Sequence, residues 1–332
     1  MKNKIAIVLI VLLALAVSSA YAGNFKRIGT AGAQELLIPI GSRGSALGGA
    51  VIADVDGLES VFWNPAGLAN LEGRQAMFTH LPYIADIAVN FGGVASSFEN
   101  IGVLAVTAKV VSIGDIEETT EAAPEGTGNV FNPTMAVMSL TYAKILTANV
   151  QFGASLLYIN ERIADVSASG VAFDAGFIYD PRWKGVSMGL VIKNYGPTMS
   201  FTGAGFDRAY EAAGQRRVQG QAQANELPSF INFGMAYNFM ANGPNDATLM
   251  GNFRSNNFSE DLWQGGMEYT YDGKYSLRVG YNYSEQEDYV YGVSFGAGLS
   301  YPIGETVLTF EYSWTETDVF NDNQYFTAKF DF

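Results

Sequence analysis

Very few side chains in this sequence could act as acids, bases or nucleophiles in a catalytic site. His80 is the single histidine, and the chain contains no cysteine. A hydrolase with a Ser–His–Asn arrangement would need His80 as its general base. His80 stands beside Pro82 and Tyr83 at the end of an alternating stretch, a position more typical of a structural polar residue. We therefore expect no enzyme activity, no metal site built from histidine or cysteine ligands, and no cofactor.

Charged side chains concentrate in two segments. Residues 203–226 carry three arginines among glutamine and alanine, and this composition fits a short amphipathic helix or a plain solvated loop equally well. The other segment is acidic and could collect divalent cations, although such a run is more typical of a solvated loop. Its acidic residues are Asp115, Glu117, Glu118, Glu121 and Glu125. With a net charge of −14, the whole chain repels phosphate backbones, so nucleic acid is not an expected partner.

Residues 1–22 have the layout of a secretory signal peptide that is cleaved on export. Lys2 and Lys4 precede an apolar run of 13 residues from Ile5 to Val17, and small residues then offer a cleavage site before Gly23. The run is too short to span a bilayer as a helix, although an uncleaved anchor is the alternative. The rest of the chain contains no second apolar run of about 18 residues, so no transmembrane helix is expected.

Beyond residue 73 the sequence alternates between large apolar and small or polar side chains. The last strand shows one apolar and one polar face. The apolar face has Phe326, Ala328, Phe330 and Phe332, and the polar face has Thr327, Lys329 and Asp331. A soluble β-sandwich also alternates, but its strands would be shorter and its outward face polar. An exported chain of aromatic strands therefore favours a closed transmembrane barrel, which satisfies every backbone hydrogen bond inside lipid.

Fourteen segments fit the template of a membrane-spanning strand, so we predict an all-β fold with an antiparallel β-barrel over residues 74–332. The predicted strands are 74–82, 86–97, 101–113, 133–144, 148–161, 168–180, 184–195, 227–240, 246–254, 262–272, 274–284, 288–301, 305–315 and 323–332. The two longest connections, 114–132 and 196–226, are the third and the seventh, whereas short ones such as 145–147 are even-numbered. This parity is typical of outer-membrane barrels, which have short periplasmic turns and longer outer loops.

The final residue, Phe332, ends its strand on the apolar face. An aromatic C-terminus in this position resembles the signal that the barrel-assembly machinery reads. We therefore expect a protein of the Gram-negative cell outer membrane, inserted by that machinery and in contact with membrane lipid and lipopolysaccharide.

Residues 23–73 do not fit the strand template, because they are rich in glycine and alanine and their apolar runs are short. They are too apolar for a disordered tail, and they cannot lie in lipid with unsatisfied backbone groups. We therefore expect them to plug the lumen as a hatch. Arg43 and Asp54 are candidates to pair there, and Asn64 before Pro65 favours a turn.

Two motifs in this predicted hatch carry a family resemblance. They are Gly41-Ser42-Arg43-Gly44, followed closely by Gly48 and Gly49, and Asn64-Pro65-Ala66-Gly67. Ahead of an aromatic barrel, these motifs resemble the PorV/PorQ family, which is similar in turn to the FadL long-chain fatty-acid transporters. The resemblance implies a fourteen-stranded barrel with an N-terminal hatch, in which the Asn-Pro-Ala turn positions the plug and does no chemistry.

Three functions remain open for such a barrel. By resemblance, a PorV-like protein would take part in type IX secretion and bind a secretion translocon and exported cargo proteins, and we place this function slightly ahead. The alternative is a FadL-like transporter of hydrophobic small molecules, such as fatty acids or hydrocarbons, which releases its ligand sideways through a break in the wall. Gly92, Gly93 and Gly102 are candidate kink sites for such a lateral opening. The third function is that of an open porin, which the plug disfavours.

Overall fold

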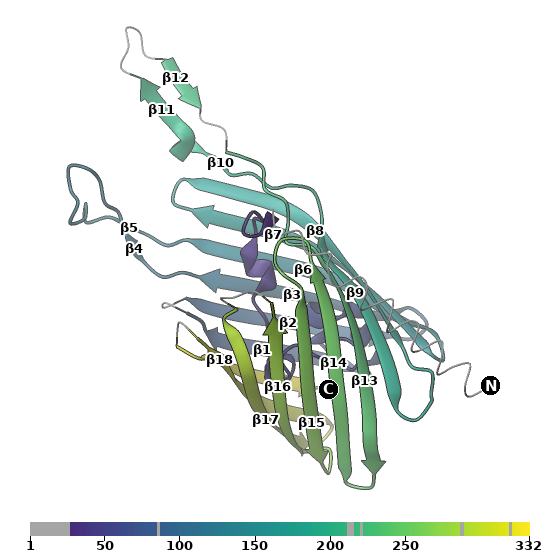
Figure 1. Cartoon of the computed structure of the whole chain (residues 1–332). Coiled ribbons are helices and arrows are strands. Elements are labelled where there is room, and N and C mark those ends of the chain that lie inside the picture. Colours follow the sequence, from purple (N-terminus) through teal and green to yellow (C-terminus); the bar gives the residue numbers. More distant parts are fainter. Residues whose placement is uncertain (1–26, 85–86, 211–215, 220–221, 286–288, 319–320) are drawn as a thin grey trace.

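Fourteen antiparallel strands form a closed barrel in the computed structural model (Figure 1). The structure describes residues 27–84, 87–210, 216–219, 222–285, 289–318 and 321–332, so the predicted signal peptide lies outside the described residues. Each barrel strand pairs with its neighbours in chain order, and the first strand closes the ring by pairing with the last. The predicted fold class is confirmed.

All fourteen predicted strands are present, with bounds that differ from the prediction by three residues at most. They are β1 Arg74–Pro82, β2 Ala88–Phe98, β3 Gly102–Ser112, β6 Thr134–Thr147, β7 Val150–Ile163, β8 Val166–Tyr179, β9 Val186–Tyr195, β13 Phe230–Asn242, β14 Asn245–Asn256, β15 Leu262–Tyr271, β16 Tyr275–Ser284, β17 Tyr291–Ile303, β18 Thr306–Thr317 and β19 Asn323–Asp331. The prediction succeeds because successive side chains of a strand point to opposite faces, so a two-sided environment imposes a period of two residues.

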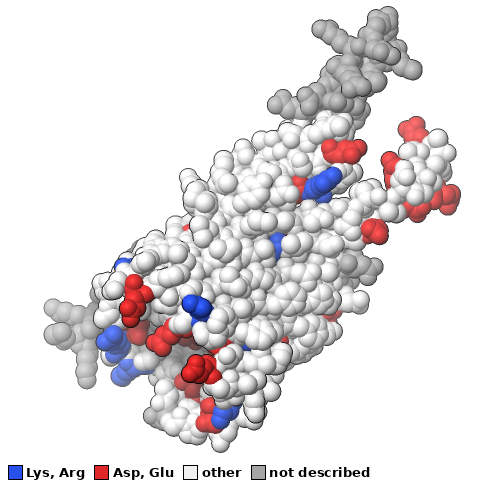
Figure 2. Space-filling view, turned by 180° about the vertical axis from the view of Figure 1, so that it is seen from behind, with Lys and Arg blue, Asp and Glu red and all other residues white. Residues whose placement is uncertain are grey.

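The alternation separates a lipid-facing surface from a lumen. On β18 and β19, Phe310, Phe326 and Phe330 point outward and are 41% to 54% exposed, whereas Glu311 and Thr327 are buried. Figure 2 shows that charged side chains gather toward the two ends of the barrel and are sparse on the surface between them. Within the described ranges, no helix is both long and apolar enough to cross a bilayer.

Two of the long connections fold into small hairpins at the same end of the barrel (Figure 1). The acidic connection contains β4 Ile116–Glu117 paired with β5 Val130–Phe131. The arginine-containing connection contains β10 Thr202–Gly203, the 3-10 turn η4 Ala204–Phe206, and a hairpin of β11 Asp207–Tyr210 with β12 Arg216–Gln219. The described part of this connection therefore contains a β-hairpin, and not the amphipathic helix that we considered from the sequence.

Residues 27–73, called the N-terminal segment below, lie inside the barrel (Figure 1). Their short helices are η2 Gln34–Leu37, α2 Ser42–Ala46, α3 Ser60–Trp63 and η3 Pro65–Asn70. Helix α2 contacts β16 to β19 and η3 contacts β3, β6, β7 and β8, so the segment touches well-separated arcs of the wall. Leu47, Ile52, Leu58 and Leu68 are almost completely buried, which places the apolar core between the segment and the wall.

Candidate functional site

The Asn-Pro-Ala-Gly motif forms the start of η3, where the N-terminal segment meets the barrel wall. The Asn64 side chain accepts a hydrogen bond from the Ala66 N–H at 3.2 Å and so caps the turn, with Pro65 at its first position. Its amide also donates to the carbonyl oxygens of Ile52 at 2.8 Å and Phe177 at 3.2 Å. Asn64 therefore joins three parts of the chain and is fully buried, which fits a positioning role.

The Gly-Ser-Arg-Gly motif forms α2 and the turn before it. Gly41 has a φ of 81°, which favours glycine, and the Gly44 N–H donates to the Glu59 carboxylate at 2.7 Å. The Ser42 hydroxyl lies 2.8 Å from the Thr327 hydroxyl, and the Ser42 N–H donates to the same oxygen at 3.1 Å. These bonds tie α2 to strand β19 of the wall.

Arg43 joins the N-terminal segment to the wall by charge. Its guanidinium donates to both carboxylate oxygens of Glu268 on β15, at 2.6 Å and 3.1 Å, and to Asp54 at 3.0 Å. The predicted pair of Arg43 with Asp54 is therefore present, but Glu268 is the closer and more buried partner. Burial lowers the pKa of Arg43, yet the two carboxylates outweigh this effect and hold the pKa above its usual value.

The charge pair continues as a chain of alternating charges across the lumen. Glu268 also accepts from Arg278 at 2.6 Å, and Arg278 pairs with Glu311 at 2.9 Å. Glu311 in turn pairs with Lys329 at 2.7 Å, and Lys329 returns to Glu59 of the N-terminal segment at 2.8 Å. Each member is at most 13% exposed in its side chain, so these ions need one another inside the barrel.

Inward-facing glycines on the strands let the N-terminal segment approach the wall closely. Gly48 has a φ of 62°, and a Cβ on Gly280 of β16 would overlap its backbone nitrogen. Likewise a Cβ on Gly176 of β8 would overlap the side chain of Asn64. The segment therefore packs against the wall backbone to backbone, which larger residues would prevent.

The candidate kink sites do not interrupt the wall. Strand β2 pairs with β1 from Arg74 to Pro82 and with β3 from Ala88 to Phe98, and neither ladder shows a register shift. Gly92 and Gly93 lie within these continuous ladders, and Gly102 is the first residue of β3 with a φ of 128°. All three glycines keep their backbone pairing, so the ladders show no break at β2 and β3, and a lateral opening there stays a prediction.

The ladder of β16 with β17 is instead incomplete. It ends at the pair Tyr281–Val293, although β16 continues to Ser284, and β17 shifts its register against β18 between Tyr291 and Ser294. A cavity of about 240 Å³ lies where this ladder ends, a place that we call the seam. It is lined by the outward-facing Tyr281 and Tyr283, by Asn282 and Ser284, by Tyr289, Val290, Tyr291 and Gly292, and by Glu316 and Asp318. Side chains from both the outward and the inward face of β16 therefore line the same cavity.

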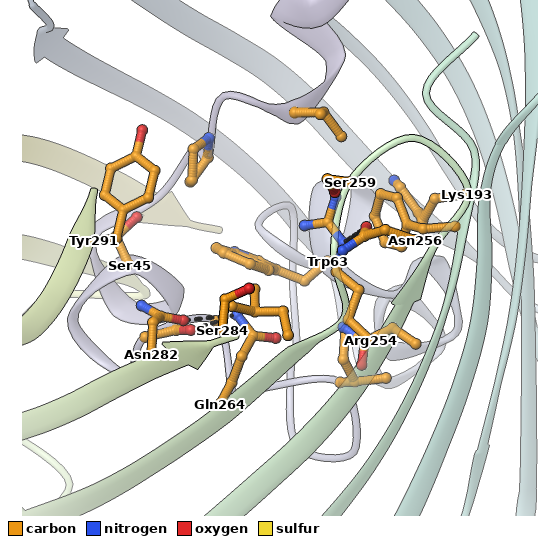
Figure 3. Close-up of a pocket in the computed structure, with 18 of the residues that line it drawn as sticks. Ser45, Trp63, Lys193, Arg254, Asn256, Ser259, Gln264, Asn282, Ser284 and Tyr291 are labelled. Carbon is orange, nitrogen blue, oxygen red and sulfur yellow. Dashed lines mark hydrogen bonds between the residues drawn. The ribbon is translucent and has the colours of Figure 1, made fainter. Parts of the chain in front are cut away.

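A second cavity of about 200 Å³ lies in the lumen beside the N-terminal segment (Figure 3). Much of its lining is apolar, with Trp63 in the middle of the view and Leu36, Ile52, Phe62 and Phe230 also lining it. It shares Asn282, Ser284, Tyr289 and Tyr291 with the cavity at the seam, so the two spaces adjoin. We refer to it as the lumen cavity.

Arg254 of β14 supplies a cation to the lumen cavity. Its Nε donates to the Asn256 side chain at 2.8 Å, and its guanidinium lies 3.5 Å from the centre of the Phe230 ring. Among the described residues it forms no ion pair, in contrast to Lys193 of the same cavity, which pairs with Asp174 at 2.5 Å. The guanidinium therefore offers further N–H donors to an anionic ligand, although the Glu260 side chain also lines this cavity. Arg254 is not among the residues predicted from the sequence, although its inward position on an alternating strand is a usable signal.

The other candidate residues from the sequence have local structural partners. His80 bonds the Asn90 side chain at 2.8 Å, which is a structural contact between neighbouring strands. No group of three or more potential metal ligands occurs in the described part of the chain, and Glu118 bonds Thr127 and Asn129 in its own loop. Phe332 points outward, 56% exposed, and its backbone pairs with Arg74.

Comparison with solved structures identifies similar barrels. The CymD monoaromatic hydrocarbon channel has 13% sequence identity and a TM-score of 0.55, with 89% of this chain and 97% of that chain covered. The Pseudomonas putida toluene transporter TodX has 12% identity and a TM-score of 0.54, with 87% and 96% covered. A Pseudomonas aeruginosa FadL homologue has 11% identity and a TM-score of 0.52, with 88% and 98% covered.

These likenesses concern the fold, because the identities are low. No protein-family model and no curated protein sequence matches the chain. The resemblance to the PorV/PorQ family therefore stays a prediction from the two motifs. What the comparisons show is that this chain has the barrel fold of FadL-type outer-membrane channels.

Proposed function

We propose that this protein is an outer-membrane channel that carries hydrophobic small molecules through its lumen cavity. The observation that carries the proposal is a largely apolar cavity inside a barrel, bounded by an N-terminal segment that is held to the wall by apolar packing and by polar contacts. Solved channels of the same fold are described as hydrocarbon and toluene transporters. We thus favour the function that we had placed second, since the type IX secretion role rests on motif resemblance alone.

The lining of the lumen cavity supports an amphipathic anion as ligand. A cavity of roughly 150 Å³ lined by apolar groups can hold a benzene-sized molecule, so about 200 Å³ fits a small aromatic body or part of an acyl chain. Arg254 adds a cation without an ionic partner among the described residues. A carboxylate on an apolar body would satisfy both features, whereas a pure hydrocarbon would leave the guanidinium unused.

The seam between β16 and β17 is the route by which we expect ligand to pass between the lumen cavity and the outer leaflet. Asn282 and Gly292 would form the next pair of the ladder beyond Tyr281 and Val293. Since the chain has no cysteine, an Asn282→Cys and Gly292→Cys pair can be joined by a short bifunctional maleimide. Crosslinking should slow ligand transfer to lipid, and unchanged transfer would exclude this route.

We expect the protein to lie in the outer membrane of the cell. Export by the N-terminal signal, insertion by the barrel-assembly machinery and contact with lipopolysaccharide stay predictions from the sequence. Labelling of an epitope in the β11–β12 connection on intact cells would test both the location and the expected orientation, because that connection should face outward.

Ligand binding by purified protein in detergent-free vesicles tests the channel function. We expect palmitate to quench or shift the fluorescence of Trp63, read as the difference from a Trp63→Phe variant. Arg254→Gln should weaken palmitate binding at least about tenfold, because it removes one charge-assisted hydrogen bond. Arg182→Gln in an exposed turn is the matched control. Binding of neither palmitate nor toluene, or a large permanently open conductance, would contradict the proposal.

A further inference from the structure

We propose that a proton shared between Glu35 and Glu161 holds residues 27–38 closed over the outer end of the lumen cavity, and that loss of this proton releases them. We call residues 27–38 the strap. The inference names a regulation of the channel and so rests on the proposed function for its meaning, but its structural basis can be tested without any ligand.

The strap separates the lumen cavity from two spaces at the outer mouth. Leu36 and Leu37 line the lumen cavity. Gln34, in the same turn η2, lines two further cavities of about 370 Å³ and 250 Å³. These two are bounded by outer-loop residues such as Phe258 and Asn225. Displacement of η2 would therefore join the mouth to the lumen cavity.

Few polar contacts hold the strap in place. The Gly32 N–H donates to the Glu226 carbonyl oxygen at 3.0 Å, and the Gly29 N–H donates to the Phe258 carbonyl oxygen at 3.4 Å. The Arg27 side chain pairs with Glu226 at 2.6 Å on the surface and lies 4.3 Å from the centre of the Phe258 ring. The Lys109 ammonium donates to the carbonyl oxygens of Glu35 at 2.6 Å and Ile38 at 3.2 Å. A segment held by so few polar contacts can move at a low cost in free energy, because exposed ion pairs contribute little.

The contact between Glu35 and Glu161 is unusual, because it joins two buried carboxyl groups. Glu35 belongs to the strap and is 1% exposed, whereas Glu161 belongs to β7 of the wall and is 6% exposed. No N–H or O–H donor among the described residues reaches either carboxyl oxygen of Glu35, and Glu161 is close enough to raise the pKa of Glu35 through its charge and a side-chain hydrogen bond. A hydrogen bond between two carboxyl groups requires a proton on one of them. Docking of the strap therefore requires that proton.

The charged groups around the pair do not neutralise it. Lys109 on β3 is the cation that faces Glu35, but its ammonium is bound to backbone oxygens. Beyond it, Lys193 of β9 is paired with Asp174 of β8. No ion pair of Glu35 or Glu161 with a cation occurs in the part of the chain that the structure describes. Two ionised carboxylates would hence repel each other in a site of low dielectric.

The direction of the effect follows from the proton balance. Burial, and then the neighbouring Glu161, raise the pKa of Glu35 to about 8. Since the docked strap holds its proton more tightly than a released strap would, docking is strongest below the ordinary pKa of a glutamate. It then weakens by up to about tenfold for each unit of rising pH until pH about 8. Protonation closes the mouth, and deprotonation opens it.

Cysteine accessibility in the full-length protein, folded in vesicles, tests this switch. Leu36 is 4% exposed and the native chain has no cysteine, so Leu36→Cys reports release of the strap through its rate of maleimide labelling. Each rate is divided by that of Thr120→Cys in an exposed loop, which removes the pH dependence of the reagent. From about pH 5.5 to about pH 7.5 we expect this ratio to rise at least tenfold and at most about a hundredfold.

Two variants decide the cause. In Glu35→Gln, and in a Glu35→Gln and Glu161→Gln double variant, the ratio should stay near its low-pH value throughout, since the amides cannot ionise. Glu125→Gln in an exposed outer loop is the matched control and should keep the full rise. Gel mobility of unheated samples confirms that each barrel is folded. A ratio independent of pH in the Leu36→Cys protein, or a rise that persists in the double variant, overturns the proposal.

The labelling assay contains no ligand, so its outcome is separate from that of the channel proposal. If labelling of the strap depends on pH but the protein binds neither palmitate nor toluene, the proposed switch is supported and the proposed channel function is contradicted. If the protein binds palmitate but labelling of the strap does not depend on pH, the channel function is supported and the switch is contradicted.

Discussion

Replacing Arg43 with methionine should loosen the N-terminal segment without unfolding the barrel. Methionine has a similar length and keeps the apolar contacts of the side chain, but it removes the only cation of the segment that contacts Glu268 in the described residues. The barrel itself keeps all its strand ladders, since Arg43 belongs to no strand. The free energy that changes is therefore that of docking the segment to the wall.

The size of the effect follows from the burial of each partner. Arg43 and Glu268 are 13% and 11% exposed in their side chains, and breaking a buried pair on one side costs about 3–5 kcal/mol. Glu268 keeps Arg278 at 2.6 Å, so the lower limit of about 3 kcal/mol applies. The contribution of Asp54, which is 43% exposed, is discounted to at most about 1 kcal/mol because solvent screens it. The fraction of molecules whose N-terminal segment is released from the wall should therefore grow about a hundredfold.

Limited proteolysis in detergent micelles measures this change. We expect cleavage within residues 27–73 to accelerate in Arg43→Met while the barrel fragment stays intact. Arg43→Lys should show an intermediate rate, because lysine keeps the charge but cannot bind both carboxylate oxygens in a fork. Arg182→Met, in an exposed turn, is the control. Equal cleavage rates in Arg43→Met and in the unmodified protein would refute the conclusion that this ion cluster anchors the segment.

Three further perturbations test other parts of the structure. Asn64→Ala removes the cap of η3 and both bonds donated by the amide, so docking of the N-terminal segment should weaken by about 1–3 kcal/mol, measured by the same proteolysis. Gly92→Ala puts its new Cβ at least 3.8 Å from other atoms, so ligand transfer should be unchanged, and a clear loss would restore β2 as a gating strand. Phe332→Ser removes the outward aromatic terminus, so less barrel should reach the membrane fraction at equal expression, and an equal yield would argue against an assembly role.

The sequence alone determined the number, order and faces of the strands. Lipid on one side and a polar lumen on the other impose a two-residue period that is legible in each strand separately, as in Phe330 beside Lys329. The local cap of Asn64 was also predictable, because its partner Ala66 lies two residues away. Both features depend on neighbours in the chain.

Only the tertiary structure decided which inward residues meet. Arg43 contacts Glu268 across 225 residues of chain, and Ser42 contacts Thr327 across 285 residues. It also decided that Arg254 lacks an ionic partner among the described residues and that the β16–β17 ladder ends before β16 does, whereas the β2–β3 ladder is continuous. Such contacts depend on the register of every ladder around the ring and on the path of the N-terminal segment inside it. No local pattern of side chains encodes either of these, because they are fixed by closure of the whole barrel.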